Sequence, residues 1–283
     1  MSGKLSQLNT LMQNVSKCDL CCREGQDQDI KKDKLLINLI AEKPISPRFG
    51  EIPSMYTDWA SRLNAKIAIV LQDWGGVEDA LSLRRHYQEQ IRKKSLSAAV
   101  AWRQTVQNRP NPSPTHINII NFLKISATLE GLKLPHDFLD QIFFTNAVLC
   151  FRHGNTSGKD NIDLRRSIRN CCFQSKFLYE QLKIVQPSIV VALGEGALSS
   201  LCISSNVALT IQSVQSLRDG FKMIDYYDLS FRLVPALHPT SHIPKGWTKD
   251  KFQRKQIADY RFIWRALSHI LGCSGDKLVS ECF

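Results

Sequence analysis

Four short apolar runs, each followed by glycine or polar residues, constrain the fold of this chain more than any other feature. Such a run before a polar turn is typical of a strand buried on both faces of a parallel sheet. The runs cover residues 66–71, 142–148, 188–193 and 231–237. Apolar residues at helical spacing predict helices over 119–132 and 168–185 between them.

Strands that alternate with helices predict the α/β class, as a three-layer α/β/α sandwich with a central four-stranded parallel sheet. Residues 1–60 are polar and irregular, and we expect an N-terminal extension there that carries a CxxC motif. Residues 61–283 form one α/β domain in this interpretation. Residues 78–114 predict an exposed helix followed by an extended loop, and residues 151–163 predict a second loop.

The charge balance narrows the class of partner. The 283 residues include 37 Lys or Arg and 26 Asp or Glu, a net charge of +11. An excess of this kind favours a polyanionic partner. No apolar run approaches the roughly 18 to 20 residues of a membrane helix, and the N-terminus lacks the apolar core of a signal peptide. We expect a monomer in the cytoplasm, associated with the nucleoid if the source is prokaryotic.

Polar residues follow the strands, where ligands of open parallel sheets bind. An Asp, an Asn and a His that converge there would form a pocket for a small polar ring with a developing charge. Taken singly, the Asp is typical of a helix cap and the His-Pro-Thr sequence of a turn. The segments are Gln72-Asp73-Trp74-Gly75-Gly76, Thr145-Asn146, Gly194-Glu195-Gly196 and His238-Pro239-Thr240-Ser241-His242.

The order of these segments resembles the uracil-DNA glycosylase superfamily, and most closely its iron–sulfur branch. Residues 71–76 are similar to the first motif of the superfamily, residues 145–150 to the TNVVKC segment, residues 190–194 to the VALG strand and residues 238–240 to the HPS motif. The resemblance covers roughly residues 53–265. It implies a monofunctional hydrolase of DNA repair that removes uracil from DNA and leaves an abasic site.

The resemblance also implies roles for single residues. Asp73 and His238 are the expected catalytic residues: the carboxylate orients water or stabilises the positive sugar, and the imidazole donates to the base oxygen that gains charge. Asn146 is expected to read the base, because an amide offers the donor and the acceptor that match uracil but not cytosine. Gln72 and Trp74 complete the base-binding set, although core burial would also explain the indole.

Base selectivity stays open, because Trp74 replaces the proline usual in the first motif and Gly75-Gly76 replaces a tyrosine that excludes the thymine methyl group. For the DNA, Thr240 and Ser241 are candidate phosphate ligands, and His242 or Ile243 stands at the position of the inserting residue. Lys245 continues the basic character, although a solvated helix face would explain the charges that follow it.

Nine cysteines remain to be explained, and an odd number in an intracellular chain argues against a disulfide framework. Cys18 and Cys21 form the CxxC motif, while Cys150 and Cys171 bracket the loop at 151–163. Four thiolates can hold a [4Fe–4S] cluster or zinc, and buried thiols without metal are the third interpretation. The resemblance favours iron, in a structural role. Cys22 and Cys172 are adjacent alternatives as ligands.

Two other functions fit the same residues. A superfamily member with an altered first motif could bind DNA or abasic sites with little or no catalysis. An α/β enzyme or nucleotide-binding module unrelated to nucleic acid could share the sheet alone. Incubation of uracil-containing DNA with the protein, followed by alkali, separates the three. The glycosylase gives strand breaks at the abasic site, the binding protein shifts the DNA without breaks, and the unrelated α/β protein does neither.

Overall fold

The computed structural model describes residues 2–18, 62–72, 89, 114–135, 138–149, 168–204, 221–239, 243 and 245–271. The chain divides into two compact units. The first unit comprises Met1–Leu63, Gln72–Arg109 and Phe144–Val185, and the second comprises Asn64–Leu71, Pro110–Phe143 and Gln186–Phe283. The predicted loop at 151–163, and residues 78–113 of the predicted helix and loop apart from Glu89, lie outside the described residues.

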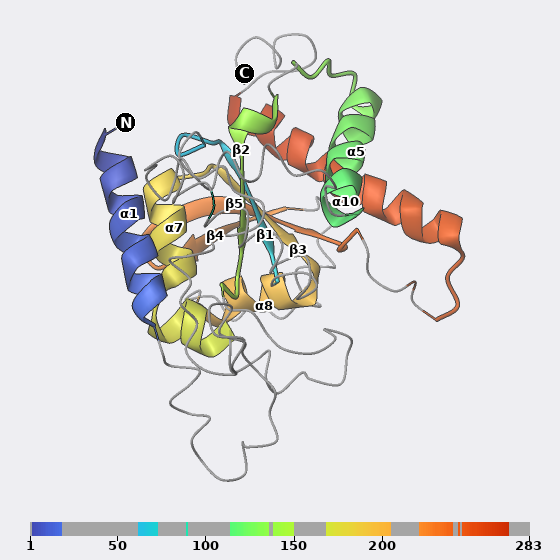
Figure 1. The fold of residues 1–283 in the computed structure, drawn as a ribbon. Helices are drawn as coiled ribbons and strands as arrows, with labels where there is room; N and C mark the ends of the chain where they lie inside the picture. Colours follow the sequence, from blue (N-terminus) through green and yellow to red (C-terminus); the bar gives the residue numbers. More distant parts are fainter. Residues whose placement is uncertain are drawn as a thin grey trace. The chain divides into compact units, whose positions relative to one another are not determined.

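A five-stranded, mostly parallel sheet confirms the predicted α/β class (Figure 1). Its order is β2-β1-β3-β5-β4. β1 and β5 both pair in parallel with β3, whereas β4 pairs with β5 in the antiparallel sense. The strands are β1 (Ile67–Leu71), β2 (Ile142–Asn146), β3 (Ile189–Leu193), β4 (Lys222–Tyr226) and β5 (Leu229–Ala236). Every residue of β1, β2 and β3 is buried, as the continuous apolar runs predicted.

β4 makes five strands where the sequence predicted four. The missed strand contains Lys222, Met223 and Asp225, which are exposed, and buries only Ile224 and Tyr226. It occupies the edge of the sheet and forms a hairpin with β5 through a turn at Tyr227, whose φ is 57°. An edge strand with one solvated face does not need a continuous apolar run, so the pattern that found the other four could not find it.

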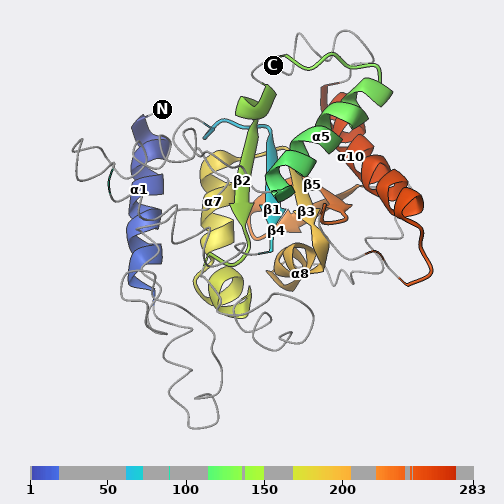
Figure 2. The same ribbon diagram turned by 45° about the vertical axis from the view of Figure 1, so that its right-hand side comes forward.

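The described helices of the second unit are α5 (Pro114–Leu129), α8 (Gly194–Ser204) and α10 (Lys249–Leu271), with a short turn η4 (Phe138–Gln141) before β2. α10 packs on β5 and β3, and α8 packs on β3, β1 and β5. α5 lies against α10 in both views (Figures 1 and 2). None of the helices within the described ranges is long and apolar enough to cross a bilayer.

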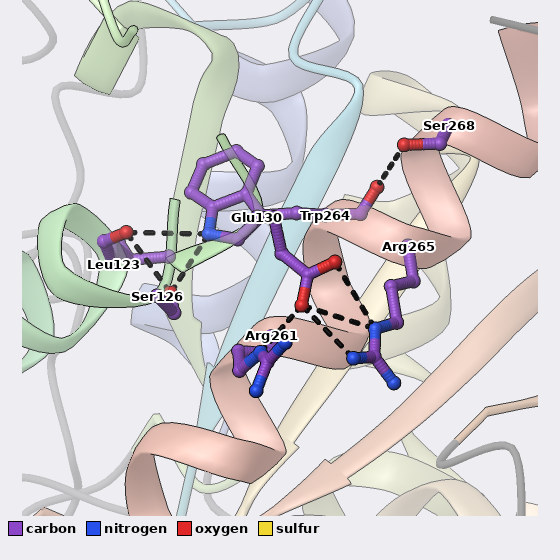
Figure 3. Close-up of polar contacts among 7 residues, drawn as sticks. All are labelled: Leu123, Ser126, Glu130, Arg261, Trp264, Arg265 and Ser268. Atoms are coloured by element: carbon purple, nitrogen blue, oxygen red, sulfur yellow. Dashed lines mark hydrogen bonds and ion pairs between the residues drawn. The ribbon is translucent and has the colours of Figure 1, made fainter. Parts of the chain in front are cut away.

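Polar contacts join α5 to α10 at two levels (Figure 3). The buried indole Nε1 of Trp264 donates to Ser126 Oγ at 2.8 Å and to the Leu123 carbonyl at 3.2 Å. Glu130, just beyond α5, forms ion pairs with Arg261 and Arg265. Burial would raise the pKa of Glu130, but hydrogen bonds from Arg265 and Arg261 hold it below its ordinary value.

α5 begins and ends at residues that favour its two termini. Pro114 occupies its first position, where proline needs no partner for the missing N–H, so the helix starts five residues before the predicted start. After the last turn, Gly131 adopts φ 76° and its N–H donates to the Thr128 carbonyl, while Leu132 N–H donates to Ala127. This pair of bonds is the Schellman ending, and it buries Leu132 against the helix end.

The described part of the first unit contains α1 (Ser2–Lys17), the π-helical turn η5 (Arg169–Gln174) and α7 (Phe177–Val185). α1 packs against α7, with Leu8 and Leu11 buried. Lys4 Nζ donates to the carbonyls of Leu63 and Val185. The expectation of an irregular start was therefore wrong for residues 2–17, because their few leucines recur at helical spacing. The boundary between an extension and a domain at residue 60 stays a prediction.

The helix predicted over 168–185 is interrupted. η5 ends at Gln174, and Lys176 adopts φ 55°, a conformation that no residue inside an α-helix has. α7 then runs from Phe177 to Val185 and ends two residues before Pro187, as predicted. Cys171 and Cys172 are both buried in this π turn.

Candidate active site

Three of the parallel strands end at one edge of the sheet, within the second unit. In the β3–β5 register, Leu193 faces Ala236, so the residues that follow, Gly194 and His238, leave the sheet at the same edge. The register of β1 with β3 sends the end of β1 toward that edge too. The physical basis of the predicted site, polar residues after parallel strands, is therefore present for these three strands.

Gly194 and His238 are in close contact. Gly194 adopts φ 83° at the junction of β3 and α8, and a Cβ atom placed on it would lie 3.3 Å from the Cβ of His238. A side chain at position 194 would therefore crowd the base of the histidine side chain as well as strain the backbone. The sequence pattern predicted only that Gly194 follows a strand, not that it lies beside His238.

His238 is half-buried, and burial lowers its pKa to about 4. Its imidazole is therefore neutral at physiological pH, with one ring nitrogen protonated and able to donate a hydrogen bond. A hydrogen bond from this neutral N–H becomes stronger as negative charge develops on its acceptor, and the imidazole does not have to lose a proton beforehand.

Asn146 ends β2 in the first unit, and its side chain is fully buried at 0% exposure. Neither its amide nitrogen nor its amide oxygen has a hydrogen-bond partner among the described residues. A buried amide without partners is destabilising by about 1–3 kcal/mol, so folded chains seldom retain one. A donor and an acceptor are thus both buried at the end of β2 without a partner among the described residues.

Hydrogen bonds anchor the residues on both sides of Asn146, although the side-chain amide of Asn146 has no partner among the described residues. Thr145 Oγ1 donates to Gln181 Oε1 of α7 at 2.6 Å, and Gln181 Nε2 in turn donates to the Phe177 carbonyl. On the other side, the Cys172 thiol donates to the Ala147 carbonyl at 3.1 Å. These buried contacts restrict the direction in which Asn146 points.

Gln72 lies beside the same segment. Its carbonyl accepts a hydrogen bond from the Val148 N–H at 2.9 Å, within the first unit. Gln72, the first residue of the predicted Gln72-Asp73-Trp74 motif, is therefore hydrogen-bonded to the residue two positions after Asn146. Asp73 and Trp74 themselves lie outside the described residues.

The predicted DNA-binding residues are described only in part. Thr240, Ser241 and His242 lie outside the described residues. Ile243 is 43% exposed and Lys245 is exposed. Trp247 follows, with the Lys251 ammonium 4.7 Å from its ring centroid. Five exposed basic side chains lie between Ile243 and Gln256: Lys245, Lys249, Lys251, Arg254 and Lys255.

Two of the four predicted cluster ligands can be placed. Cys18 follows α1, and its Sγ lies 3.8 Å from Ser175 Oγ, just after η5. Cys171 is buried in η5, whereas Cys21 and Cys150 lie outside the described residues. Within the ranges that the structure describes, no three metal-binding side chains gather into one group. The N-terminal cysteine and the cysteine-bearing turn are nevertheless neighbours in the first unit.

Sequence reasoning missed the helix side chains that hold the strand ends. Gln181 anchors the segment of Asn146, and Gln256 and Asp259 of α10 bind the backbone at His238. One signal was available: these polar residues interrupt apolar helix faces, and all three are buried. Asn146 belongs to the first unit and His238 to the second, and a cavity shared by Asp73, Asn146 and His238 stays a prediction.

Residues 80–267 match a family model described as the uracil DNA glycosylase superfamily. The matched range covers more than half of the chain and includes both Asn146 and His238. It begins after the segment of Gln72 to Gly76 that resembled the first motif. The chain has no match among curated proteins.

Proposed function

Because the chain belongs to the uracil-DNA glycosylase superfamily, we propose that it hydrolyses the N-glycosidic bond of uracil in DNA and leaves an abasic site. Family membership supports DNA glycosylase activity in general, without specifying the base. The observation that carries the choice of uracil is the buried amide of Asn146, which has no partner among the described residues.

Asn146 is suited to read one face of a pyrimidine. Its nitrogen donates and its oxygen accepts, so it can meet the O4 and N3–H of uracil together. Cytosine presents a donor where uracil has O4 and an acceptor where uracil has N3–H, so one orientation of the amide cannot serve both bases. Binding of cytosine would leave polar groups of the amide and the base unpaired away from water, which lowers the affinity for that base.

His238 would act on the departing base. Bond cleavage moves negative charge onto the base oxygens, and a neutral imidazole N–H there gains strength as that charge grows. The low pKa of His238, about 4, keeps the ring in this form across the neutral range. Asp73 would stabilise the positive sugar and orient the attacking water, a role that rests on the motif alone.

DNA must be bent and the target nucleotide extruded before this chemistry can start. We assign phosphate contacts to Thr240, Ser241 and Lys245, and assign filling of the vacated stack to His242 or Ile243. The exposure of Ile243 supports this part of the proposal, because a large apolar side chain in water gains by insertion between bases. The predicted monomeric state and cytoplasmic location stay predictions.

We also assign the chain to the iron–sulfur branch, with Cys18, Cys21, Cys150 and Cys171 as cluster ligands. The proximity of Cys18 to Ser175 supports a common site for the N-terminal pair and η5. Cys172 is the weaker candidate, because its thiol donates a hydrogen bond to the Ala147 carbonyl, whereas a cluster ligand is a thiolate that has no S–H to donate. When bound, such a cluster would cross-link the segments that carry its ligands.

Iron and acid-labile sulfide in anaerobically purified protein test the cluster. Cys18→Ser and Cys171→Ser should lower both contents, while Cys172→Ser and the control Cys202→Ser should leave them unchanged. A protein purified with zinc in place of iron would contradict the assignment to the iron–sulfur branch.

Cleavage of a uracil-containing oligonucleotide, followed by alkali, tests the activity. We expect strand breaks with the wild type and none with the thymine counterpart. Asp73→Asn and His238→Ala should each slow single-turnover cleavage by about 100-fold or more while DNA binding changes little. His269→Ala, an exposed histidine on α10, is the control. DNA that is bound but never cut by the wild type would instead support the binding protein considered above.

A further inference from the structure

Two backbone groups that flank the His238 side chain are bound by side chains of α10. The Leu237 N–H donates to Asp259 Oδ2 at 3.0 Å, and Gln256 Nε2 donates to the His238 carbonyl at 3.0 Å. β5 ends at Ala236, so these groups lie beyond the strand. Backbone groups that leave a sheet where water is partly excluded need other partners, and here one helix supplies both.

The two helix residues interrupt the buried face of α10. The other buried residues described on α10 are apolar or aromatic: Phe252, Tyr260, Ile263, Trp264, Ala266 and Leu267. Gln256 and Asp259 are three positions apart, on the same side of the helix, and are only 1% and 2% exposed. Polar groups in the core are destabilising unless they are paired, and both of these pair with the His238 segment.

Lys255 affects the pKa of Asp259, the acceptor of the Leu237 N–H. Burial raises the pKa of Asp259, and the Lys255 ammonium one turn away opposes that effect through a hydrogen bond and its charge. The hydrogen bond from the Leu237 N–H also lowers the pKa of Asp259, although burial keeps that pKa above its ordinary value. From α8, Gly194 closes the space beside the His238 Cβ, so the histidine is limited from a second element.

We propose that Gln256 and Asp259 are positioning residues, which hold the backbone at Leu237 and His238 at two points and so aim the His238 imidazole. This inference rests on the proposed function, in which the His238 ring donates to the departing base. Displacement of a catalytic group by about 1 Å can lower a rate by about 100-fold, so loss of either backbone contact should slow the reaction through His238.

Three variants on α10 and one on α5 test the proposal. Gln256→Met removes the donor to His238 at similar volume, and Asp259→Leu removes the acceptor for Leu237. Asp259→Asn keeps an acceptor oxygen and is the conservative rescue. Ser126→Ala, which removes a hydrogen bond to Trp264 of the same helix without touching residues 237–238, is the matched control for stability.

We expect Gln256→Met and Asp259→Leu to slow single-turnover cleavage of uracil DNA by about 10- to 100-fold, with DNA affinity within about 2-fold of wild type. Asp259→Asn should recover most of the rate, and Ser126→Ala should change stability alone. Unchanged rates in both Gln256→Met and Asp259→Leu would overturn the proposal, as would an equal loss of rate in Ser126→Ala.

Hydrogen exchange at the Leu237 amide separates this inference from the proposed function. If the wild type removes no uracil, the proposed function fails. The exchange rate at Leu237 then tests by itself whether Gln256 and Asp259 hold the His238 segment. Faster exchange at Leu237 in Gln256→Met, where Asp259 is intact, would support joint holding by the two residues. Exchange equal to that of wild type would overturn it.

Discussion

Asn146 is the residue at which stability and proposed function oppose each other. Its amide is buried and unpartnered among the described residues, whereas the hydroxyl of the preceding Thr145 is buried and hydrogen-bonded. The two neighbours therefore respond to loss of polarity with opposite signs.

We expect Asn146→Leu to keep or raise the free energy of unfolding, because it removes a desolvated amide at similar volume. Thr145→Val should lower it by about 1–3 kcal/mol, since Gln181 Oε1 loses its donor. Urea denaturation measures both, and the uracil assay should show no cleavage by Asn146→Leu. Destabilisation by Asn146→Leu as large as that by Thr145→Val would mean that the amide has a partner in the folded protein.

His238 links the site to pH. Its pKa falls from 6.5 to about 4 on folding, so between these values the unfolded chain binds a proton that the folded chain does not. Stability from this group is complete above pH 6.5 and is lost as the pH falls toward 4, up to about 3 kcal/mol.

The difference in unfolding free energy between wild type and His238→Gln, followed from pH 7.5 to pH 4, isolates this effect from the other titrating groups. The difference should change in favour of the variant as the pH falls. A constant difference would show that His238 titrates normally in the folded protein. Cleavage by the wild type should likewise show no inflection near pH 6.5 that is due to His238.

At the scale of elements, the junctions between strands and helices carry the specific constraints. Gly131 ends α5 and Gly194 joins β3 to α8, and both have φ near 80°. They differ in surroundings: a Cβ at Gly131 meets nothing within 4 Å, whereas a Cβ at Gly194 meets His238.

Gly131→Ala should lower stability by about 1–2 kcal/mol through backbone strain alone and leave cleavage unchanged. Gly194→Ala should lower stability further and also slow cleavage, because it displaces His238. Thermal unfolding and single-turnover rates of the two variants make the comparison. Equal effects of the two substitutions on rate would show that the Gly194–His238 contact does not matter for the site.

Elements also show where sequence patterns lose their power. The strands at 67–71, 142–146 and 189–193 were predicted within two residues at either end, because burial on both faces demands unbroken apolar runs. β4 was missed because only alternate residues are buried, and the break before α7 was missed because both sides of it are apolar at helical spacing.

For the whole molecule, the net charge of +11 predicts a strong dependence of DNA affinity on salt. Each phosphate that is neutralised contributes about 0.9 to the slope of log K against log salt. The five exposed basic residues from Lys245 to Lys255 would account for a slope of about −4 to −5.

Lys249→Gln combined with Arg254→Gln should reduce that slope by about 2, as measured by fluorescence anisotropy between 50 and 200 mM salt. Lys124→Gln, an exposed lysine on α5, is the control and should leave the slope unchanged. If the double variant kept the slope of the wild type, the basic segment after Ile243 would not contact phosphate.

The sequence by itself determined the α/β class, the buried strands and the polar residues that follow them, because these depend on runs of neighbouring residues. It also contained the segments whose order resembles the family that residues 80–267 match. Only the tertiary structure decided which helix residues bind the strand ends: Gln256 lies 18 residues from His238, and Gln181 lies 36 from Thr145. Burial likewise set the pKa of His238 and left the amide of Asn146 without a partner among the described residues. Such properties arise from packing between distant segments, and no local pattern of residues encodes them.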